Sequence, residues 1–463
     1  MFKTVEMPLW LLILILLFAA VTFASHFLFP SVRWFFRRRL ERAVKRLNKR
    51  LAVPIQPFKL ARRYDMIQRV IYDPQVSQAI AGHAKETGDP ENVAFQRARR
   101  YAREIVPAFS AFAYFGFAIR LARFLGNAFY RVRLAHQGTA NLRTIDPDDT
   151  VVFVMNHRSN MDYVLVTYLA AQESALSYAV GEWARVWPLS RLIRAVGAYF
   201  IRRKSRNELY RRVLSCYVKQ ATAAGVTQAM FPEGGLSMSG ELMPPKMGLL
   251  KYITDGFDGT GRDVIFVPVA LNYDRVLEDK ILIAAEKDPK HRFKARIGVV
   301  AAHTLKLVWL KIIGRYHRFG YAAVSYGSPI SLREFQKTHG GDLTERLSQE
   351  LIREIGQIVP VLPVPLISWL IQTRGPQTRQ ELEAGFAEII EGLPNAYLHL
   401  PRNTPDKGVD HGLVQLAKRA VLIQQDGRYA PNPAQQDILR YYANSIGHLM
   451  PPSSDLPHSA AAK

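Results

Sequence analysis

The segment TVVFVMN at residues 150–156 indicates the fold class of this chain. It is short, rich in β-branched residues and almost uninterrupted in its apolar character, which is typical of a strand covered on both faces of a sheet. VTQAMF at 226–231 and VIFVPVAL at 264–271 have the same character. Helical patterns separate these runs, among them residues 207–225, which end at Gly225 as helices often do. The alternation predicts an α/β domain with a central, mostly parallel sheet flanked by helices.

A polar turn, Asn156-His157-Arg158-Ser159-Asn160-Met161-Asp162, directly follows the first of these strands. Ligands of open α/β sheets bind at the carboxyl ends of the strands. Positions five apart lie about 140° apart on an ideal helix, so His157 and Asp162 can meet only if His157 precedes the helix that Asp162 joins. A carboxylate that holds one imidazole nitrogen leaves the other to take a proton. On spacing alone, a capping or core role remains the alternative.

Two further polar patches interrupt the pattern. GAYFIRRK at 197–204 is consistent with a solvated basic face or with a phosphate site, since guanidinium groups bind phosphate through two directed hydrogen bonds. FPEGGLS at 231–237 follows a strand and contains the Pro and Gly residues of a turn, with Glu233 placed to bind hydroxyl groups. The adjoining GLSMSG has its serines at the wrong offsets for a GxSxG elbow, so a serine hydrolase is unsupported.

The blocks NHRSNMDYVL, GAYFIRRKS, FPEGGLSMSG and VPVALNYDRV, in that order between residues 153 and 276, resemble the four sequence blocks of the glycerol-3-phosphate and related glycerolipid acyltransferases. PPKMGLL at 244–250 and helical regions on both sides of the core resemble the bacterial glycerol-3-phosphate branch. The resemblance implies transfer of a fatty acyl group from acyl-CoA or acyl-carrier protein, as co-substrate, to a glycerol hydroxyl. It implies no further cofactor and no metal.

The resemblance also implies roles for particular residues. His157 is the expected general base, and Asp162 is expected to orient it and stabilise the imidazolium. Residues expected to bind substrate are Arg158, Ser159, Arg202, Arg203, Glu233, Gly234, Gly235, Lys246 and Pro268, with the arginines of the second block on the acceptor phosphate, the third block on the glycerol and Pro268 on the acyl donor side.

The third block departs from the family pattern at two positions. Related glycerol-3-phosphate enzymes usually continue it as EGGRSR or EGTRSR, whereas this chain has Leu236 and Met238 at the arginine positions. Phosphate contacts must then come from elsewhere, for example from Arg202, Arg203, Lys204 or Lys246. Glycerol 3-phosphate is the first expected acceptor. Lysophosphatidate, another lysolipid or a different alcohol is the alternative, and a catalytically silent membrane lipid-binding protein is the second alternative.

The charge distribution favours a membrane partner. Lys and Arg number 62 against 39 acidic residues, a formal charge of +23, which implies an anionic partner. Residues 8–30 carry no Lys, Arg, Asp or Glu and are long enough to span a bilayer, and nine basic residues follow in 31–50. These features predict a single-pass anchor in the inner cell membrane, a cytoplasmic catalytic domain and contact with anionic headgroups. A cleaved signal peptide is the alternative to the anchor. No nucleic-acid motif is present, so nucleic acid is not an expected partner.

The domain organisation predicted from these features has five parts: a transmembrane anchor at 1–30, a basic helical membrane-proximal region at 31–131, the catalytic domain at 132–335, a C-terminal helical region at 336–450 and a disordered tail at 451–463. Two apolar runs, 105–119 and 359–371, are short for membrane spans and are expected to be interfacial or core. The single cysteine, Cys216, excludes an intrachain disulfide.

Overall fold

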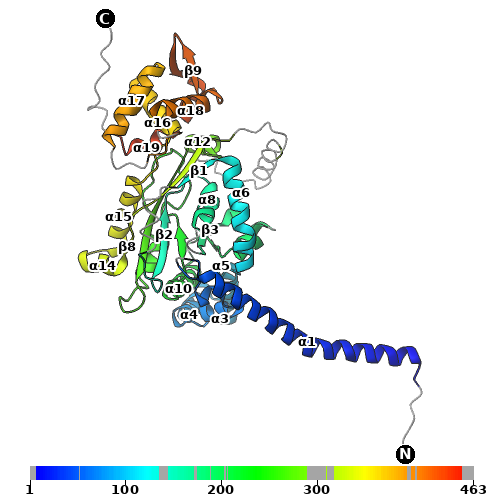
Figure 1. The fold of residues 1–463 in the computed structure, drawn as a ribbon. Coiled ribbons are helices and arrows are strands. Elements are labelled where there is room, and N and C mark those ends of the chain that lie inside the picture. Colours follow the sequence, from blue (N-terminus) through cyan, green and yellow to red (C-terminus); the bar gives the residue numbers. More distant parts are fainter. Residues whose placement is uncertain are drawn as a thin grey trace, which may run out of the picture. The chain divides into compact units, whose positions relative to one another are not determined.

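A computed structural model shows the fold of the chain (Figure 1). It describes residues 7–51, 53–134, 144–170, 175–187, 189–202, 205, 207–288, 309, 318–393, 398–401 and 404–450. Arg203, Lys204 and the tail 451–463, all named in the sequence predictions, lie outside the described residues. The chain divides into two compact units, Met1–Pro54 and Ile55–Lys463. The five-part organisation drawn from the sequence stays a prediction.

The first unit contains one long helix, α1 (Leu9–Asn48). This helix continues from the predicted apolar span into the basic segment without a break. Within the part of the chain that the structure describes, no helix is both long and apolar enough to cross a membrane. The transmembrane anchor predicted for residues 1–30 is therefore not supported.

The second unit is built around a sheet whose described strands number eight, in the order β1-β7-β6-β2-β5-β3-β4, with β8 paired to β6. Their bounds are β1 (Arg131–Leu134), β2 (Thr150–Met155), β3 (Ser177–Gly181), β4 (Tyr199–Ile201), β5 (Gln228–Met230), β6 (Val264–Tyr273), β7 (Tyr321–Tyr326) and β8 (Ile330–Ser331). The strands from β6 through β4 are parallel to their neighbours, while β7 and β8 run antiparallel to β6. The predicted mixed α/β class with a mostly parallel central sheet is confirmed.

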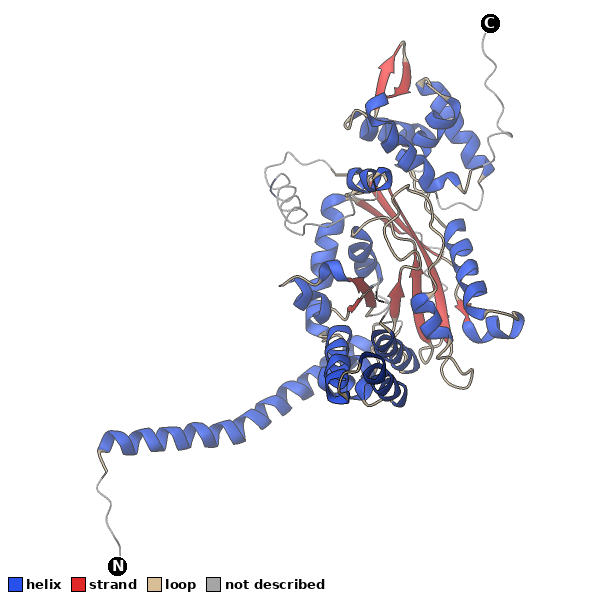
Figure 2. Cartoon of the chain, turned by 180° about the vertical axis from the view of Figure 1, so that it is seen from behind, coloured by secondary structure: helices blue, strands red, loops and turns tan. Residues whose placement is uncertain are grey.

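The three apolar runs read from the sequence form adjacent central strands. β6, β2 and β5 lie side by side, with Val152 level with Phe266 on one side and with Gln228 on the other. Every residue of these three strands is buried. Helices lie on both sides of the sheet, with α6 and α8 on one side and α15 on the other (Figures 1 and 2). Continuous apolar character was the right signal because both faces of these strands are covered.

The helices before the sheet pack within the second unit. They are α2 (Pro57–Leu60), α3 (Arg63–Ile71), α4 (Pro74–Thr87), α5 (Glu91–Ile105), η1 (Phe112–Ala118) and α6 (Ile119–Phe129). Helix α4 begins after Asp73, whose carboxylate accepts from the Gln75 N–H at 2.9 Å. It ends at Gly88, which adopts a left-handed conformation with φ 71°.

The helices between and after the strands complete the α/β layers. They are α8 (Met161–Ala170), η2 (Glu182–Ala184), α9 (Leu189–Ala195), α10 (Glu208–Ala223), α11 (Gly248–Thr254), α12 (Asp279–Lys287), α14 (Leu332–Thr338) and α15 (Leu343–Gln357). Ser331 caps α14 by accepting from the Glu334 N–H at 3.1 Å.

The C-terminal part consists of α16 (Pro363–Arg374), α17 (Arg379–Gly392), α18 (Pro405–Ala417), η4 (Pro433–Gln435), α19 (Gln436–Gly447) and a hairpin of β9 (Leu422–Gln425) and β10 (Arg428–Pro431). The sequence analysis did not predict this hairpin. Its turn uses Asp426 and Gly427, both at positive φ, which is a two-residue hairpin connection. The apolar run at 359–371 is core, because α16 buries every residue from Pro363 to Ile371.

Candidate active site

The first, third and fourth sequence blocks meet at one edge of the sheet. His157 follows β2, Glu233 follows β5, and Tyr273 is the last residue of β6. These three strands are parallel neighbours, so their carboxyl ends lie together. The site thus occupies the place where open α/β sheets bind their ligands.

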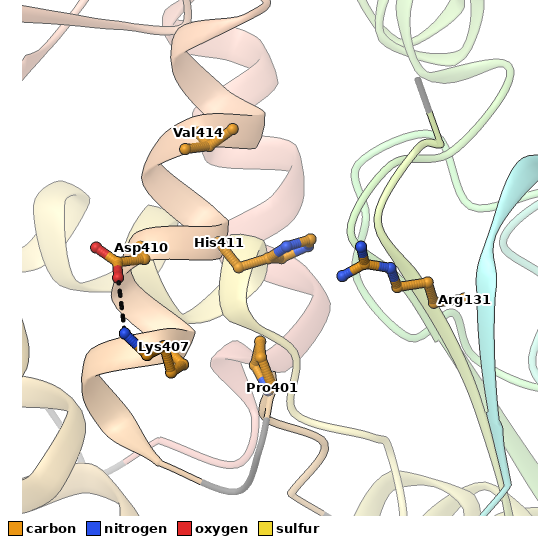
Figure 3. A pocket seen from close by; sticks show the side chains of 6 residues that line it. All are labelled: Arg131, Pro401, Lys407, Asp410, His411 and Val414. Carbon is orange, nitrogen blue, oxygen red and sulfur yellow. Dashed lines mark ion pairs between the residues drawn. The ribbon is translucent and has the colours of Figure 1, made fainter. Parts of the chain in front are cut away.

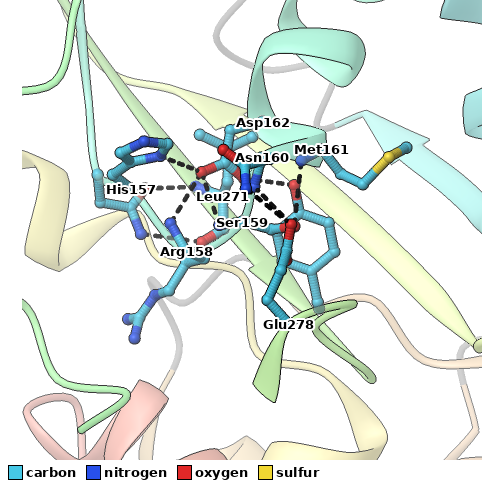
Figure 4. Close-up of polar contacts among 10 residues, drawn as sticks. His157, Arg158, Ser159, Asn160, Met161, Asp162, Leu271 and Glu278 are labelled. Atoms are coloured by element: carbon cyan, nitrogen blue, oxygen red, sulfur yellow. Dashed lines mark hydrogen bonds and ion pairs between the residues drawn. The ribbon is translucent and has the colours of Figure 1, made fainter. Parts of the chain in front are cut away.

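His157 and Asp162 form a buried hydrogen-bonded pair (Figure 4). The His157 Nδ1 atom lies 2.8 Å from the Asp162 Oδ2 atom, and both side chains are almost inaccessible to solvent. Asp162 occupies the first turn of α8, and His157 lies in the turn before that helix, as the spacing requires. Because a carboxylate only accepts hydrogen bonds, Nδ1 is the protonated nitrogen and Nε2 is the basic one.

The Asp162 carboxylate is held by further donors. Its Oδ2 atom accepts from the backbone N–H groups of Arg158 and Ser159 at 2.8 and 3.0 Å. Its Oδ1 atom accepts from the Tyr273 hydroxyl at the end of β6. These contacts fix the carboxylate from two strands at once, so the orientation of the imidazole is set before any ligand binds.

Glu278 anchors the turn from its other side. Its Oε2 atom accepts from the Ser159 hydroxyl at 2.7 Å, and its Oε1 atom accepts from the Asn160 side chain at 3.0 Å. The Ser159 oxygen also accepts from the Met161 N–H at 3.1 Å. The hydroxyl group of Ser159, a predicted substrate-binding residue, is therefore engaged in hydrogen bonds with Glu278 and Met161.

The imidazole of His157 is positioned by the third block. Its ring stacks on Phe231 with centroids 4.0 Å apart and meets Tyr163 edge-on at 5.5 Å. The backbone carbonyl of His157 accepts from the Ser237 backbone N–H at 3.0 Å, and the backbone N–H of His157 donates to the Glu233 carboxyl group. The first and third blocks therefore form one rigid unit.

Beside this pair lies a buried polar cluster that we call the Arg158 cluster, made of Arg158, Glu233 and Tyr441. Arg158, Glu233 and Tyr441 are nearly fully buried, and the Arg158 side chain points away from Asp162 (Figure 4). Among the described residues, no hydrogen-bond partner is found for Arg158 Nε and Nη1, Glu233 Oε2 or the Tyr441 hydroxyl. Buried polar atoms are rarely left without partners, so these atoms together indicate a place for a polar ligand.

The electrostatics of this cluster favour a neutral Glu233. Burial raises the pKa of Glu233 from its ordinary value of 4.5 to about 8, and the positive charge of Arg158 only partly opposes that rise. A protonated carboxyl group can both donate and accept a hydrogen bond. The Arg158 guanidinium therefore faces a largely uncharged neighbour at neutral pH.

Helix α19 closes the third block over the site. The Arg158 Nη2 atom donates to the Ser445 carbonyl at 3.1 Å, and the Asn444 side chain donates to the Ser239 carbonyl at 3.0 Å. Gly240 packs directly on this helix, since a Cβ atom there would lie 2.0 Å from the Tyr441 carbonyl oxygen. The C-terminal helix is thus part of the site.

We expect Gly240→Ala to lower the free energy of unfolding by at least about 2 kcal/mol, because the methyl group meets rigid backbone and Gly240 has φ 87°. Chemical denaturation measures the loss. Gly235→Ala is the matched control in the same loop, because a Cβ atom there meets nothing within 4 Å. Equal effects of the two substitutions would contradict the close contact with α19.

The structure places the predicted second-block arginine in an ion pair. Arg202 binds Glu104 of α5 through two hydrogen bonds of 2.9 and 2.7 Å, and Arg185 binds the same carboxylate at 2.7 Å. The Glu104 hydrogen bonds are the main reason why the pKa of Arg202 is raised. In this arrangement Arg202 is committed to Glu104 rather than to the Arg158 cluster.

The remaining predicted residues lie around the third block and β6. The Lys246 N–H donates to the Pro232 carbonyl at 2.7 Å, and the Lys246 side chain covers Gly234, which has φ 69°. Pro268 is buried in β6 level with Val154 of β2. Leu236 is half-buried, and Met238 is 42% exposed.

Sequence reasoning missed Tyr273, Glu278 and Tyr441. Tyr273 lies in the fourth block at the end of β6 and Glu278 follows that block, so polar residues at a strand end were an available signal. Tyr441 lies in an amphipathic helix far along the chain, and its tyrosine offered no signal beyond a core position. Among the described residues, no group of three His, Cys, Asp or Glu side chains is arranged to hold a metal ion.

Two family models match the chain. Residues 133–272 match the Acyltransferase family, and residues 308–455 match the glycerol-3-phosphate acyltransferase C-terminal region. The first match covers the first three blocks and part of the fourth, and the second includes α19. The resemblance predicted from the sequence blocks is confirmed, and an O-acyltransferase is the class of enzyme that these matches support.

Curated relatives agree with the family models. The glycerol-3-phosphate acyltransferase of Alteromonas mediterranea is 25% identical over 84% of this chain and 50% of its own length. That of Pseudomonas putida is 24% identical over 88% of this chain and 52% of its own length. The chain therefore spans about half the length of the curated relatives it matches.

A search of solved structures matched the 1-acyl-sn-glycerophosphate acyltransferase PlsC from Thermotoga maritima. The match has 20% sequence identity and a TM-score of 0.30, and it covers 51% of this chain and 78% of the other.

Proposed function

We propose that this chain, which carries an acyltransferase domain followed by a region of the glycerol-3-phosphate acyltransferase type, transfers a fatty acyl group from acyl-CoA or acyl-carrier protein to glycerol 3-phosphate. The observation that carries the proposal is the preformed His157–Asp162 pair beside the Arg158 cluster. It combines a general base with a cation and a neutral carboxyl group, the groups that a phosphorylated alcohol requires.

The proposed reaction begins at the imidazole. Nε2 of His157 takes the proton of the acceptor hydroxyl as its oxygen attacks the thioester carbonyl carbon. The carbon–sulfur bond breaks, the thiolate leaves, and the imidazolium returns the proton to the sulfur. Asp162 stabilises the imidazolium and keeps Nδ1 protonated throughout. No covalent enzyme intermediate is required.

The Arg158 cluster is the proposed acceptor site. Arg158 Nε and Nη1 and the Tyr441 hydroxyl offer donors to a phosphate group, and a neutral Glu233 offers a donor and an acceptor to a glycerol hydroxyl. This assignment also accounts for Leu236 and Met238, because the cation that holds phosphate then comes from the first block instead of the third. The acyl donor is proposed to approach from the side of Pro268.

A membrane surface is the proposed working location of the enzyme. Phe112, Phe117 and Phe124 on η1 and α6 are 80%, 51% and 48% exposed, and Arg120 lies exposed among them. Aromatic residues combined with arginine suit the boundary between acyl chains and anionic headgroups. These exposed residues support an interfacial position for the apolar run at 105–119. They also support contact with membrane lipids, into which acylated products partition.

A lysolipid is the second candidate acceptor. Met238 and Met247 are 42% and 40% exposed at either end of the segment that joins the third block to α11. Exposed apolar side chains at this place would contact an acyl chain more favourably than water. The names of the curated relatives favour glycerol 3-phosphate.

An acceptor panel tests the proposal. Purified full-length protein with acyl-CoA or acyl-carrier protein is expected to convert labelled glycerol 3-phosphate to lysophosphatidate, measured by product extraction. The same donors are offered with lysophosphatidate and with unphosphorylated glycerol. Preference for lysophosphatidate would replace the first candidate by the second, and transfer to none of the acceptors with any donor chain length would contradict both.

A further inference from the structure

A cavity lies between β1 and α18, and none of the residues that line it belongs to the Arg158 cluster. It has a volume of about 270 Å³ and is lined by Arg131, Pro401, Lys407, Asp410, His411 and Val414. Figure 3 shows the Arg131 guanidinium of β1 pointing toward the His411 ring of α18. β1 lies at the edge of the sheet, separated from β6 by β7.

Two arginines of β1 concentrate positive charge beside this cavity, and one of them, Arg131, lines it. Arg131 and Arg133 are two residues apart on a strand, so they share one face. Their guanidinium carbons lie 5.8 and 5.3 Å from the centre of the same ring, that of Tyr321. Among the residues that the structure describes, neither arginine forms an ion pair with a carboxylate. Two like charges are thus held together without a counter-charge.

The carboxylates near the cavity are already engaged. Asp410 lies 2.7 Å from Arg379 and 3.7 Å from Lys407. Asp274 accepts from the backbone N–H groups of Tyr321 and Val364 and lies 2.9 Å from His411 Nε2. Neither carboxylate therefore serves as a counter-ion for the β1 arginines.

A nearby histidine reflects the same positive charge. The pKa of His399 is lowered to about 4, mainly by burial and further by the charge of Arg133. Its Nε2 atom is buried and has no hydrogen-bond partner in the described part of the chain. The electrostatic environment around Arg133 therefore disfavours another cation.

We propose that this cavity binds the phosphate group of a phosphomonoester, with Arg131 as its main ligand and Arg133 as the neighbouring cation on β1. Guanidinium groups bind phosphate through directed, charge-assisted hydrogen bonds, and an anion here removes the repulsion between the two arginines. His411 and Lys407 complete the wall. The proposal does not rest on acyl transfer, because it uses none of the residues around His157.

The first experiment titrates inorganic phosphate into the full-length protein by calorimetry. Arg131→Gln is expected to weaken binding at this site by roughly tenfold or more, since it removes a hydrogen bond to a charged group. The Arg158 cluster would also take phosphate, so the difference between the wild type and Arg131→Gln isolates this cavity. Arg353→Gln is the matched control, because Arg353 is exposed on α15 and pairs with Glu350 and Glu354.

The second experiment separates two sources of the phosphate. CoA is compared with dephospho-CoA, and vesicles containing phosphatidate are compared with phosphatidylcholine vesicles. Loss of CoA binding alone in Arg131→Gln assigns a nucleotide ligand, and loss of phosphatidate binding alone assigns a lipid headgroup. Equal phosphate binding by the wild type, Arg131→Gln and Arg353→Gln overturns the proposal. The phosphate titration decides this even if no acceptor is acylated.

Discussion

Replacement of His157 by alanine is expected to lower kcat for acyl transfer by about 10²- to 10⁴-fold, the usual contribution of a positioned general base. The reason is the geometry of the pair: Nδ1 is held 2.8 Å from Asp162, so Nε2 is the nitrogen that takes the hydroxyl proton. Initial rates of lysophosphatidate formation at saturating donor and acceptor measure the effect. Glycerol 3-phosphate affinity should change far less, because the Arg158 cluster is retained.

His339→Ala is the matched control, since His339 is exposed at the C-terminal end of α14, where its ring stacks on Phe335 and, among the described residues, forms hydrogen bonds only within that helix end. Because His157 packs on Phe231, the unfolding free energy of both variants must be compared with that of the wild type. Wild-type kcat in a folded His157→Ala protein would disprove the base assignment. If that variant also supported growth in place of the wild-type gene, the catalytically silent alternative would be favoured.

Arg158→Met is expected to raise KM for glycerol 3-phosphate by roughly ten- to a hundredfold, the loss that accompanies removal of a hydrogen bond to a charged group. Tyr441→Phe should raise it in the same direction. Tyr441→Phe should leave the free energy of unfolding nearly unchanged, because the Tyr441 hydroxyl lacks a partner in the described structure. Arg158→Met also removes the hydrogen bond from Nη2 to the Ser445 carbonyl and is expected to cost about 1–3 kcal/mol of stability. Steady-state kinetics and chemical denaturation, performed on the same preparations, separate affinity from stability.

The neighbouring tyrosine provides the control for this prediction. The Tyr442 hydroxyl donates to Asp279 at 2.6 Å and accepts from the Val276 N–H at 2.9 Å. Tyr442→Phe should therefore cost about 1–3 kcal/mol of stability with little change in KM. A Tyr441→Phe protein that loses stability as Tyr442→Phe does, with unchanged KM, would show that Tyr441 is structural and that the acceptor binds elsewhere.

The central strands could be predicted from the sequence because their signal is local, and the resemblance of the four ordered blocks to the glycerolipid acyltransferases singled out His157 and Asp162 as the candidate pair. An uninterrupted apolar run reports burial on both faces, and the five-residue spacing of His157 and Asp162 permits contact only across a turn into a helix. The helix caps at Asp73, Gly88 and Ser331 are local in the same sense, since each depends on a few adjacent residues.

The surroundings of the proposed acceptor site, the Arg158 cluster, could not be predicted from local sequence patterns. The Arg158 guanidinium meets the Ser445 carbonyl 287 residues further along the chain, and no local pattern marks that contact. The sequence predicts Arg202 as a phosphate ligand, but the structure pairs it with Glu104, which lies 98 residues earlier in the chain. The raised pKa of Glu233 depends on burial, which a sequence does not display.

By itself, the sequence determined the α/β class, the edge of the sheet that carries the site and the two residues proposed to move the proton. The class and the edge follow from periodicity and from polar residues at strand ends, whereas the two residues follow from the resemblance of the four ordered blocks to the acyltransferase family. The tertiary structure alone decided which buried cation lies beside Glu233, that α19 supplies Tyr441, and that Arg131 of β1 lines a cavity with Arg133 beside it. Those features depend on which side chains, far apart in the sequence, are packed against one another, and only the folded chain determines that packing.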